Sequence, residues 1–306
     1  MKKILVSLGI NEGHKALLEK IAAGRAEFTY RKISETTPED VLQADGIIGK
    51  VNPAWVSQAK QLQWLQLNSA GMDAFLKPGI LPENCILHSA VGAYGLTVSE
   101  HMLALTFALV RNLPQYARNQ AESNWKDEGP VISVCNSTVL VLGLGDIGGS
   151  YARKLKALGA YVIGVRQSDK PKPEYLDEQY TIDKLDEVIG RADIIASVLP
   201  SAPGLQKLFN EERFGKVKKG VYLLNCGRGD LIDQEALKKA LDDGIVKAAA
   251  LDVTSPEPLP ADDSLWNYRN VMITPHVAGG FHLQQTVDRI VELAAEHMDA
   301  WLSKAE

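Results

Sequence analysis

Apolar runs of strand length alternate with helix-like segments along the second half of the chain. Six such runs follow one another: Thr138–Leu142, Tyr161–Val165, Asp193–Leu199, Val221–Cys226, Lys247–Val253 and Val271–Thr274. Strands buried on both faces read as continuous apolar runs, and helical crossovers between them place them in a parallel sheet. The pattern therefore predicts an α/β fold with a Rossmann-type, doubly wound parallel sheet.

A similar alternation begins at the N-terminus. It predicts a strand, a helix and two further short strands, at Lys3–Leu8, His14–Ala23, Gly46–Gly49 and Trp64–Leu67. A chain of 306 residues is long enough for about two domains. We therefore expect a second α/β domain here, of the flavodoxin-like type.

A glycine-rich loop follows the first of the six runs. The strand leads into Gly143, Gly145 and Gly148 at the spacing Gly-x-Gly-x-x-Gly, and a helical stretch begins directly after it. The first glycine permits the tight turn, the second lets a pyrophosphate approach the backbone, and the third lets helix and strand pack closely. The order of strand, glycines, helix and strand favours dinucleotide binding over a merely structural turn. Asp146 and Ile147 of the same loop are then expected cofactor contacts.

The end of the second run bears on the choice between NAD and NADP. An acidic residue there would bind the 2′-hydroxyl of NAD, whereas an arginine accommodates the 2′-phosphate of NADP. The chain has Arg166 at this place, with Ser168 close behind it, and no acid. We therefore expect NADP(H) to be preferred, with NAD(H) also usable. The alternative is that Arg166 only caps the strand in solvent.

Two helical patterns bear on the domain boundaries. The stretch from Val98 to about Tyr116 predicts one apolar helix, and Ser99 and Glu100 suit its N-terminus. Apolar residues at helical spacing over Phe281–Leu302 predict a last helix, which we expect to pack on the first domain. A discontinuous substrate domain, residues 1–99 plus 283–306, would then receive the dinucleotide-binding domain, residues 100–282, as an insertion.

Three polar residues follow the last three runs. Arg228 lies between glycines, Glu257 lies in a proline-stiffened turn, and His276 lies between a proline and small residues. The carboxyl ends of parallel strands meet at one edge of the sheet, where ligands bind in this fold. We therefore expect the three side chains to gather at that edge. Ala278, two residues after the histidine, is a further expected cofactor contact.

These residue types suit hydride transfer between a nicotinamide and a C–OH carbon. A histidine titrates near neutral pH and can move the proton of the oxygen. A carboxylate bonded to its ring, Glu257, would fix its tautomer and stabilise its charged form. Arg228 would bind a substrate carboxylate through a bidentate fork and polarise the neighbouring carbonyl. Taken singly, each residue also has a structural interpretation, because any of the three side chains can simply hold a turn.

Composition argues against several other classes. A net charge of −5 gives no general attraction to nucleic acid or to anionic membranes, and no apolar stretch approaches the roughly 20 residues of a membrane-spanning helix. The three cysteines, Cys85, Cys135 and Cys226, suggest neither a disulfide framework nor metal-ligand spacing. The apolar run near Met1 is too short for a signal peptide. We therefore expect a cytoplasmic protein without a metal site.

Together the motifs resemble those of the D-isomer-specific 2-hydroxyacid dehydrogenase family. The resemblance covers essentially the whole chain and rests on the glycine loop, Asn225-Cys226-Gly227-Arg228-Gly229, Asp252-Val253 with Glu257-Pro258, and Thr274-Pro275-His276. It implies that Arg228 binds the substrate, that Glu257 is the partner of the histidine, and that His276 contacts the substrate as the acid/base.

The resemblance also implies further contacts with the cofactor. Asp252 and the backbone of Cys226 would hold the nicotinamide carboxamide, and Leu199 with Pro200 would border the adenosine.

For the substrate, the resemblance points to the first domain. Asn68–Asp73 is similar to the family's substrate loop, in which the amides of Ala70 and Gly71 would meet the substrate carboxylate. Members of the family form dimers through the helix near Val98–Arg118, so the resemblance implies a homodimer. The remaining histidines are expected to be surface or packing residues, except that His101 or His282 could instead lie near the cleft.

The sequence thus predicts an NADP(H)-preferring reductase of a small 2-oxo acid, such as glyoxylate, hydroxypyruvate or a branched or aromatic analogue. A different class is a regulatory protein that senses the dinucleotide on the same scaffold without turnover. The presence of the histidine, the glutamate and the arginine favours the enzyme, since a sensor has no need of them.

Overall fold

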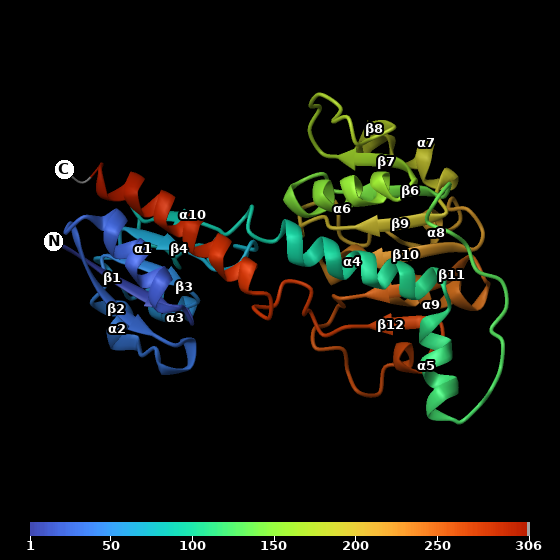
Figure 1. The fold of residues 1–306 in the computed structure, drawn as a ribbon, viewed down its shortest axis with the longest axis horizontal. Helices are drawn as coiled ribbons and strands as arrows, with labels where there is room; N and C mark the ends of the chain where they lie inside the picture. Colours follow the sequence, from blue (N-terminus) through green and yellow to red (C-terminus); the bar gives the residue numbers. More distant parts are fainter. Residues whose placement is uncertain (305–306) are drawn as a thin grey trace. The chain divides into compact units, whose positions relative to one another are not determined.

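The computed structural model describes residues 1–304, and these residues form two compact units. The first unit combines Met1–Tyr94 with the segment from Phe281 onward, and the second unit is Gly95–Gly280. The first unit is therefore discontinuous in sequence. Each unit is built around one parallel sheet that carries helices (Figure 1).

The first unit contains, within its described residues, a five-stranded parallel sheet in the order β2-β1-β3-β4-β5 (Figure 1). Its strands are β1 (Lys2–Ser7), β2 (Ala26–Arg31), β3 (Gly46–Gly49), β4 (Trp64–Gln66) and β5 (Ile86–His88). This strand order is that of flavodoxin-like folds, so the predicted architecture is confirmed. Neither β2 nor β5 stands out in the sequence, because β2 alternates half-buried with exposed residues and β5 has only three residues.

The helices of the first unit include the last helix of the chain. They are α1 (Glu12–Ala22), α2 (Pro38–Leu42), α3 (Pro53–Val56) and α10 (Gln284–Leu302), with the short 3-10 helix η1 (Ile33–Glu35). Helix α10 packs on α1, and its Trp301 stacks on Trp64 of β4 with ring centroids 5.3 Å apart. Gly46 makes room for this pair, since a Cβ there would lie 2.9 Å from the Trp301 ring. The predicted packing of the last helix on the first domain is therefore confirmed.

The second unit contains, within the residues described, a seven-stranded parallel sheet in the order β12-β11-β10-β9-β6-β7-β8 (Figure 1). Its strands are β6 (Thr138–Leu142), β7 (Tyr161–Arg166), β8 (Glu178–Thr181), β9 (Ile194–Ser197), β10 (Val221–Asn225), β11 (Val246–Leu251) and β12 (Val271–Ile273). Counted along this unit, the order is the Rossmann order 3-2-1-4-5-6 with one more strand beside the sixth. The predicted Rossmann-type fold is therefore confirmed.

The number of strands predicted for this sheet is wrong by one, because β8 was not expected. Its four residues are polar or aromatic and half-buried at the sheet edge, so no apolar run marks them. The strand is fixed through Glu178, which accepts hydrogen bonds from Tyr161, Tyr180 and Arg191. The Arg191 guanidinium and the two hydroxyls lower the pKa of Glu178 to about 2.

Helices cover this second sheet and connect its strands. They are α4 (Gly95–Val110), α5 (Leu113–Ala121), α6 (Asp146–Ala157), α7 (Leu185–Val188), α8 (Glu211–Phe214) and α9 (Gln234–Asp242). Short 3-10 helices are η2 (Ile182–Lys184), η3 (Ile189–Arg191), η4 (Gly229–Leu231) and η5 (Ser264–Asn267). The central strands are buried along their whole length and form the core with apolar side chains of these helices.

The prediction of one helix from Val98 to about Tyr116 is wrong. Helix α4 begins three residues earlier, at Gly95, and a break at Asn112 separates it from α5. Asn112 takes a left-handed conformation with a φ of 56°, and Pro114 can neither donate a backbone hydrogen bond nor fit behind the carbonyl of Val110 in a continuous helix. Neither these helices nor any other helix within residues 1–304 combines the length and apolarity that crossing a membrane requires.

Candidate active site

The glycine loop lies between β6 and α6, as its sequence predicts. Gly143 has a φ of 96°, and a Cβ on Gly148 would lie 1.8 Å from the Gly143 carbonyl oxygen, so the turn admits no side chain there. Gly145 is the N-cap of α6 and has open space around it, and within the described chain no side chain caps this helix end. The first N–H groups of a twelve-residue helix are thus available to an anion, which fits a pyrophosphate.

Asp146 and Ile147 are the first two residues of α6, and the side chain of Asp146 points away from open solvent. Its carboxylate is turned toward the start of α4, since a Cβ on Gly95 would lie 2.3 Å from Oδ1. Its Oδ2 is buried and has no hydrogen-bond partner among residues 1–304. A negative side chain aimed at a pyrophosphate would repel it, so we expect any contact of Asp146 with the cofactor to come from its backbone.

Other predicted cofactor residues follow neighbouring strands of the same sheet. Arg166 is the last residue of β7, and its buried Nε has no hydrogen-bond partner within the part of the chain described. Exposed Ser168 lies two residues further. Leu199 and Pro200 come directly after β9, the strand beside β6. All of these positions lie at the carboxyl edge of the sheet.

Cys226 follows β10 and has a thiol that stays protonated. Burial raises the pKa of this thiol, and the nearby negative charge of Asp252 raises it further. A neutral, partly buried thiol is a poor nucleophile, so we expect any contact of Cys226 with a ligand to come from its backbone.

The three predicted catalytic residues come from adjacent strands. Arg228 follows β10, Glu257 follows β11 and His276 follows β12, and these strands are neighbours in the sheet. Nδ1 of His276 lies 3.0 Å from Oε2 of Glu257, although 19 positions separate the two residues. Both side chains are about half exposed, at 48% and 43%, so solvent and small molecules can reach the pair. The hydrogen bond on Nδ1 leaves Nε2 as the nitrogen that can exchange a proton with a substrate.

The loop of Arg228 is fixed by its neighbours. A Cβ on Gly227 would lie 2.4 Å from the carbonyl oxygen of Leu199, and one on Gly229 would lie 1.9 Å from that of Thr254. The buried side chain of Asn225 accepts from the Gly227 N–H at 3.1 Å and donates to the Arg228 carbonyl at 2.9 Å. This role of Asn225 could not be predicted from the sequence, because an asparagine at a strand end carries no signal of what it binds.

The loop of His276 is held by Asp252, which is only 2% exposed. The carbonyl of Asp252 accepts from the His276 N–H at 2.8 Å, and its carboxylate accepts from the N–H groups of Val277 and Ala278 at 3.0 and 3.1 Å. His276 itself has a φ of 52°, a left-handed conformation that is strained for a residue with a Cβ. Asp252 therefore binds three consecutive residues of the loop.

His101 is one of the two histidines for which the sequence left a place near the cleft open, and it lies beside Thr274 and Asp252. Its Nε2 lies 3.1 Å from the hydroxyl of Thr274 and 3.6 Å from Oδ1 of Asp252. Only the fold brings His101 and Thr274 together, because 173 positions separate them in the sequence.

The predicted substrate loop belongs to the first unit and follows β4. Ala70 and Gly71 are half exposed. Ser69 donates to the Gly71 carbonyl at 2.9 Å, and Tyr94 donates to the Asn68 carbonyl. The loop is thus anchored at both ends while its middle stays accessible.

Comparison with known proteins identifies the family. The model of the NAD-binding domain of D-isomer specific 2-hydroxyacid dehydrogenases matches residues 103–278, more than half of the chain. The chain belongs to this family. It is an NAD(P)-dependent oxidoreductase of 2-hydroxy or 2-oxo acids, and the resemblance seen in the sequence is confirmed.

Three similar proteins illustrate the relationship. D-3-phosphoglycerate dehydrogenase 2 of Arabidopsis thaliana is 32% identical over 90% of this chain, which spans 45% of that relative's length. A family member from Aeromonas salmonicida is 28% identical, with a TM-score of 0.85 over 99% of this chain and 96% of its own. The NADPH-dependent glyoxylate/hydroxypyruvate reductase of Sinorhizobium meliloti, solved with NADP and sulfate, is 27% identical, with a TM-score of 0.80 over 100% of this chain and 96% of its own.

Proposed function

We propose that this dehydrogenase reduces a small 2-oxo acid to the D-2-hydroxy acid, with NADPH as the preferred reductant. The observation that carries the proposal is the hydrogen bond between His276 and Glu257, next to the strand that presents Arg228. The bound nicotinamide would supply the hydride. Nε2 of His276 would give the proton to the carbonyl oxygen, because Nδ1 is engaged by Glu257. Arg228 would bind the substrate carboxylate and polarise the carbonyl.

The remaining site residues have assigned roles in this proposal. Asp252, Cys226 and Ala278 would contact the nicotinamide, and the amides of Ala70 and Gly71 would meet the substrate carboxylate. The role of each domain is part of the same proposal, with residues 1–99 and 283–306 binding the substrate and residues 100–282 binding the dinucleotide. The relative from Sinorhizobium meliloti supports glyoxylate and hydroxypyruvate as the first substrates to test.

A substrate panel tests the function. The purified enzyme would be mixed with NADPH or NADH and with glyoxylate, hydroxypyruvate, pyruvate and branched or aromatic 2-oxo acids, and loss of the reduced cofactor's absorbance would be followed. Turnover of at least one 2-oxo acid is expected. Tight binding of the cofactor without turnover of any of them would instead favour the dinucleotide sensor.

The preference for NADP(H) rests on Arg166, and Arg166→Asp is expected to reverse it. A charge-assisted bond from a guanidinium to the 2′-phosphate contributes roughly 1.5–3 kcal/mol, and a carboxylate there would repel the phosphate while suiting a free 2′-hydroxyl. The ratio of kcat/KM for NADPH to that for NADH should therefore fall by about a hundredfold or more. Arg289→Asp, the same charge change on an exposed residue of α10, is the control. An unchanged ratio in Arg166→Asp would show that another residue selects the cofactor.

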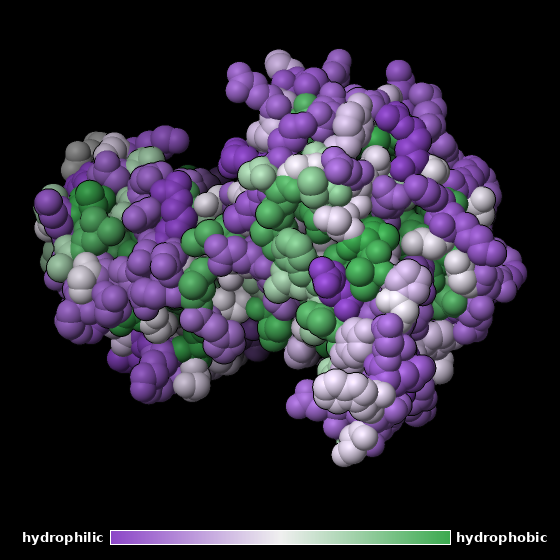
Figure 2. All heavy atoms as spheres, turned by 45° about the vertical axis from the view of Figure 1, so that its right-hand side comes forward, coloured by the Kyte–Doolittle hydropathy of each residue, from purple (hydrophilic) through white to green (hydrophobic). Residues whose placement is uncertain are grey.

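We also propose that the enzyme is a homodimer that associates through the α4–α5 face of the second unit. Figure 2 shows hydrophobic side chains gathered over α4 on this face. The exposed apolar residues of α4, α5 and the segment after α5 are Leu96, Phe107, Leu113, Trp125 and Val131. An apolar groove of about 470 Å³ lies beside them, between α5 and the segment η5–β12. An apolar surface of this kind is typical of a contact between subunits.

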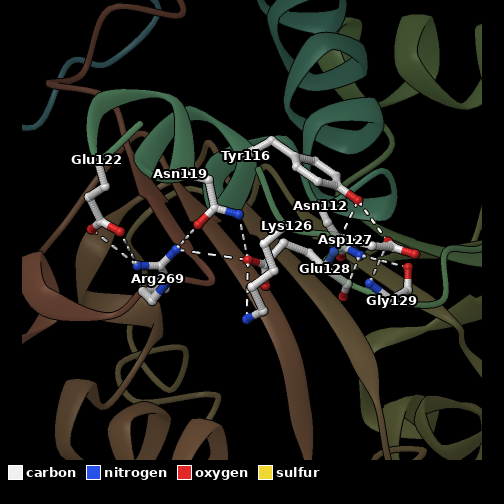
Figure 3. Close-up of polar contacts among 9 residues, drawn as sticks. All are labelled: Asn112, Tyr116, Asn119, Glu122, Lys126, Asp127, Glu128, Gly129 and Arg269. Carbon is white, nitrogen blue, oxygen red and sulfur yellow. Dashed lines mark hydrogen bonds and ion pairs between the residues drawn. The ribbon is translucent and has the colours of Figure 1, made fainter. Parts of the chain in front are cut away.

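Polar contacts hold the segment after α5 in place, so that its fully exposed Trp125 is presented on a fixed backbone. Asn119 donates to Glu128 at 2.6 Å, and Tyr116 donates to Asp127 at 3.1 Å (Figure 3). Arg269 contacts both Asn119 and Glu122 from the far end of the same network (Figure 3).

Light scattering tests the dimer. The wild type is expected at twice the 33.4 kDa of one chain, and Phe107→Glu with Leu113→Glu should shift it to the monomer, because two buried charges would oppose the contact. Leu158→Glu places the same charge on an exposed leucine of another helix end and should leave the mass unchanged. A monomeric wild type would contradict this proposal.

A further inference from the structure

A short chain of hydrogen bonds lies behind the loop of His276, and two of its members, His101 and Thr274, have no role in the proposed mechanism. It runs from His101 of α4 through the hydroxyl of Thr274 to the carboxylate of Asp252. Asp252 is the residue that binds the backbone of the three loop residues from His276 onward. The chain therefore ends on the carboxylate that binds the N–H groups of Val277 and Ala278, the two residues after His276.

The direction of these hydrogen bonds follows from the number of protons available. The Thr274 hydroxyl has one hydrogen to donate. Its oxygen lies 2.6 Å from Oδ1 of Asp252, a carboxylate oxygen that only accepts. Thr274 must therefore accept a hydrogen bond from Nε2 of His101, 3.1 Å away, so this Nε2 carries a proton. Each donor in the chain then has one acceptor.

The two oxygens of the Asp252 carboxylate accept hydrogen bonds from different donors, and the Thr274 hydroxyl is one of them. Oδ2 accepts from the Ala278 N–H, and Oδ1 accepts from both the Val277 N–H and the Thr274 hydroxyl. Without the hydroxyl, the buried Oδ1 would keep one donor, and the carboxylate could turn about its bond to Cβ. The left-handed conformation of His276 persists only while its surroundings enforce it.

Helix α4 contacts the loop of His276 at a second point, which helps to fix the position of the loop. Thr97, one turn before His101, donates from its hydroxyl to the Ala278 carbonyl at 3.3 Å. His101 is largely buried, with 23% of its side chain exposed, so its ring is held by packing as well. A sixteen-residue helix thus gives the loop a fixed reference.

We propose that His101 is a positioning residue for the reaction: through the Thr274 hydroxyl it fixes the Asp252 carboxylate and thereby the His276 loop. This inference rests on the proposed role of His276 as the acid/base. His101 does not touch the reacting atoms, and its contribution is to hold the imidazole in the geometry that proton transfer requires.

The test compares variants that break the chain with variants that keep it. Thr274→Val removes the hydroxyl at nearly constant shape, and His101→Leu removes the ring nitrogen. Thr274→Ser keeps a hydroxyl, and His101→Gln keeps an N–H donor near the position of Nε2. Thr106→Val is the matched control, since it removes a buried hydroxyl of the same helix that bonds to Tyr151 instead of the loop.

Two readouts are measured for each variant. Amide hydrogen exchange of the peptide that contains residues 275–280 reports on the loop directly, and kcat, KM and the cofactor Kd report on the reaction. Thr274→Val and His101→Leu are each expected to speed this exchange and to lower kcat by about tenfold or more. The double variant should lose little more than either single variant, because both break one chain. Thr274→Ser and His101→Gln should restore most of kcat, and Thr106→Val should change stability without changing the exchange of the loop.

Other outcomes would overturn the inference. The first is amide exchange of the loop that stays at the wild-type rate in Thr274→Val and His101→Leu. The second is a loss of kcat in the double variant that equals the product of the two single losses. If the wild type turned over no 2-oxo acid, the proposed function would fail by the substrate panel. The exchange measurement would still decide separately whether His101 and Thr274 hold the loop.

Discussion

Replacing His276 with alanine is expected to lower kcat by roughly a thousandfold, since positioned acid/base catalysis contributes about 10²–10⁴ to a rate. The structure gives the reason. Glu257 engages Nδ1 of His276 at 3.0 Å, so the imidazole presents Nε2 as its exchangeable nitrogen. Without the ring, the alkoxide that forms on hydride transfer would have to take its proton from water. The measurement is steady-state kcat with the best 2-oxo acid of the panel.

Controls separate loss of chemistry from loss of fold in this variant. The side chain is half exposed and fills no core position, so the melting temperature and the Kd for NADPH should stay close to those of the wild type. Added imidazole should restore part of the activity of His276→Ala, because it can enter the vacated space as a free acid. Glu257→Gln should lower kcat less than His276→Ala does, since it keeps the ring but removes the negative charge beside it. A His276→Ala enzyme with near-normal kcat would refute the acid/base assignment.

The local sequence carries most of the fold and the positions of the proposed catalytic side chains. Buried parallel strands are apolar along their whole length, and the glycines of the cofactor loop stand where backbone atoms leave no room for a Cβ. In such a sheet a residue that follows a strand must lie at one edge, so the approach of His276 to Glu257 could be expected from their places after β11 and β12.

Features that depend on long-range contacts could not be predicted in the same way. Strand β8 is formed by pairing with β7 and by the bonds of Glu178, so its own sequence looks like a loop. The end of α4 depends on a left-handed Asn112, a conformation that an asparagine only sometimes takes. His101 and Thr274 meet only because α4 lies against β10 and β11, and β12, the strand before the loop, pairs with β11. Nothing within a few positions of either residue indicates the other.

Replacing Arg228 with alanine is expected to lower kcat/KM for the 2-oxo acid by roughly a thousandfold, through both a higher KM and a lower kcat. A bidentate pair between a guanidinium and a carboxylate makes two charge-assisted hydrogen bonds, each of which contributes about 1.5–3 kcal/mol. The same positive charge would stabilise the oxygen that becomes negative during hydride transfer, which is why kcat should fall together with binding.

The backbone of the loop around Arg228 is held by contacts that do not involve the arginine side chain. Asn225 binds the Arg228 carbonyl and the Gly227 N–H, so the backbone keeps its course when the side chain is shortened. Arg228→Lys keeps the charge without the planar fork and should therefore recover only part of the lost kcat/KM. Arg213→Ala is the matched control. Arg213 belongs to the same unit and binds the carboxylate of Asp186, which is not one of the proposed site residues. If Arg228→Ala kept the wild-type KM and kcat while the cofactor Kd rose, Arg228 would be a cofactor ligand, and the substrate carboxylate would have to be bound by the amides of Ala70 and Gly71 alone.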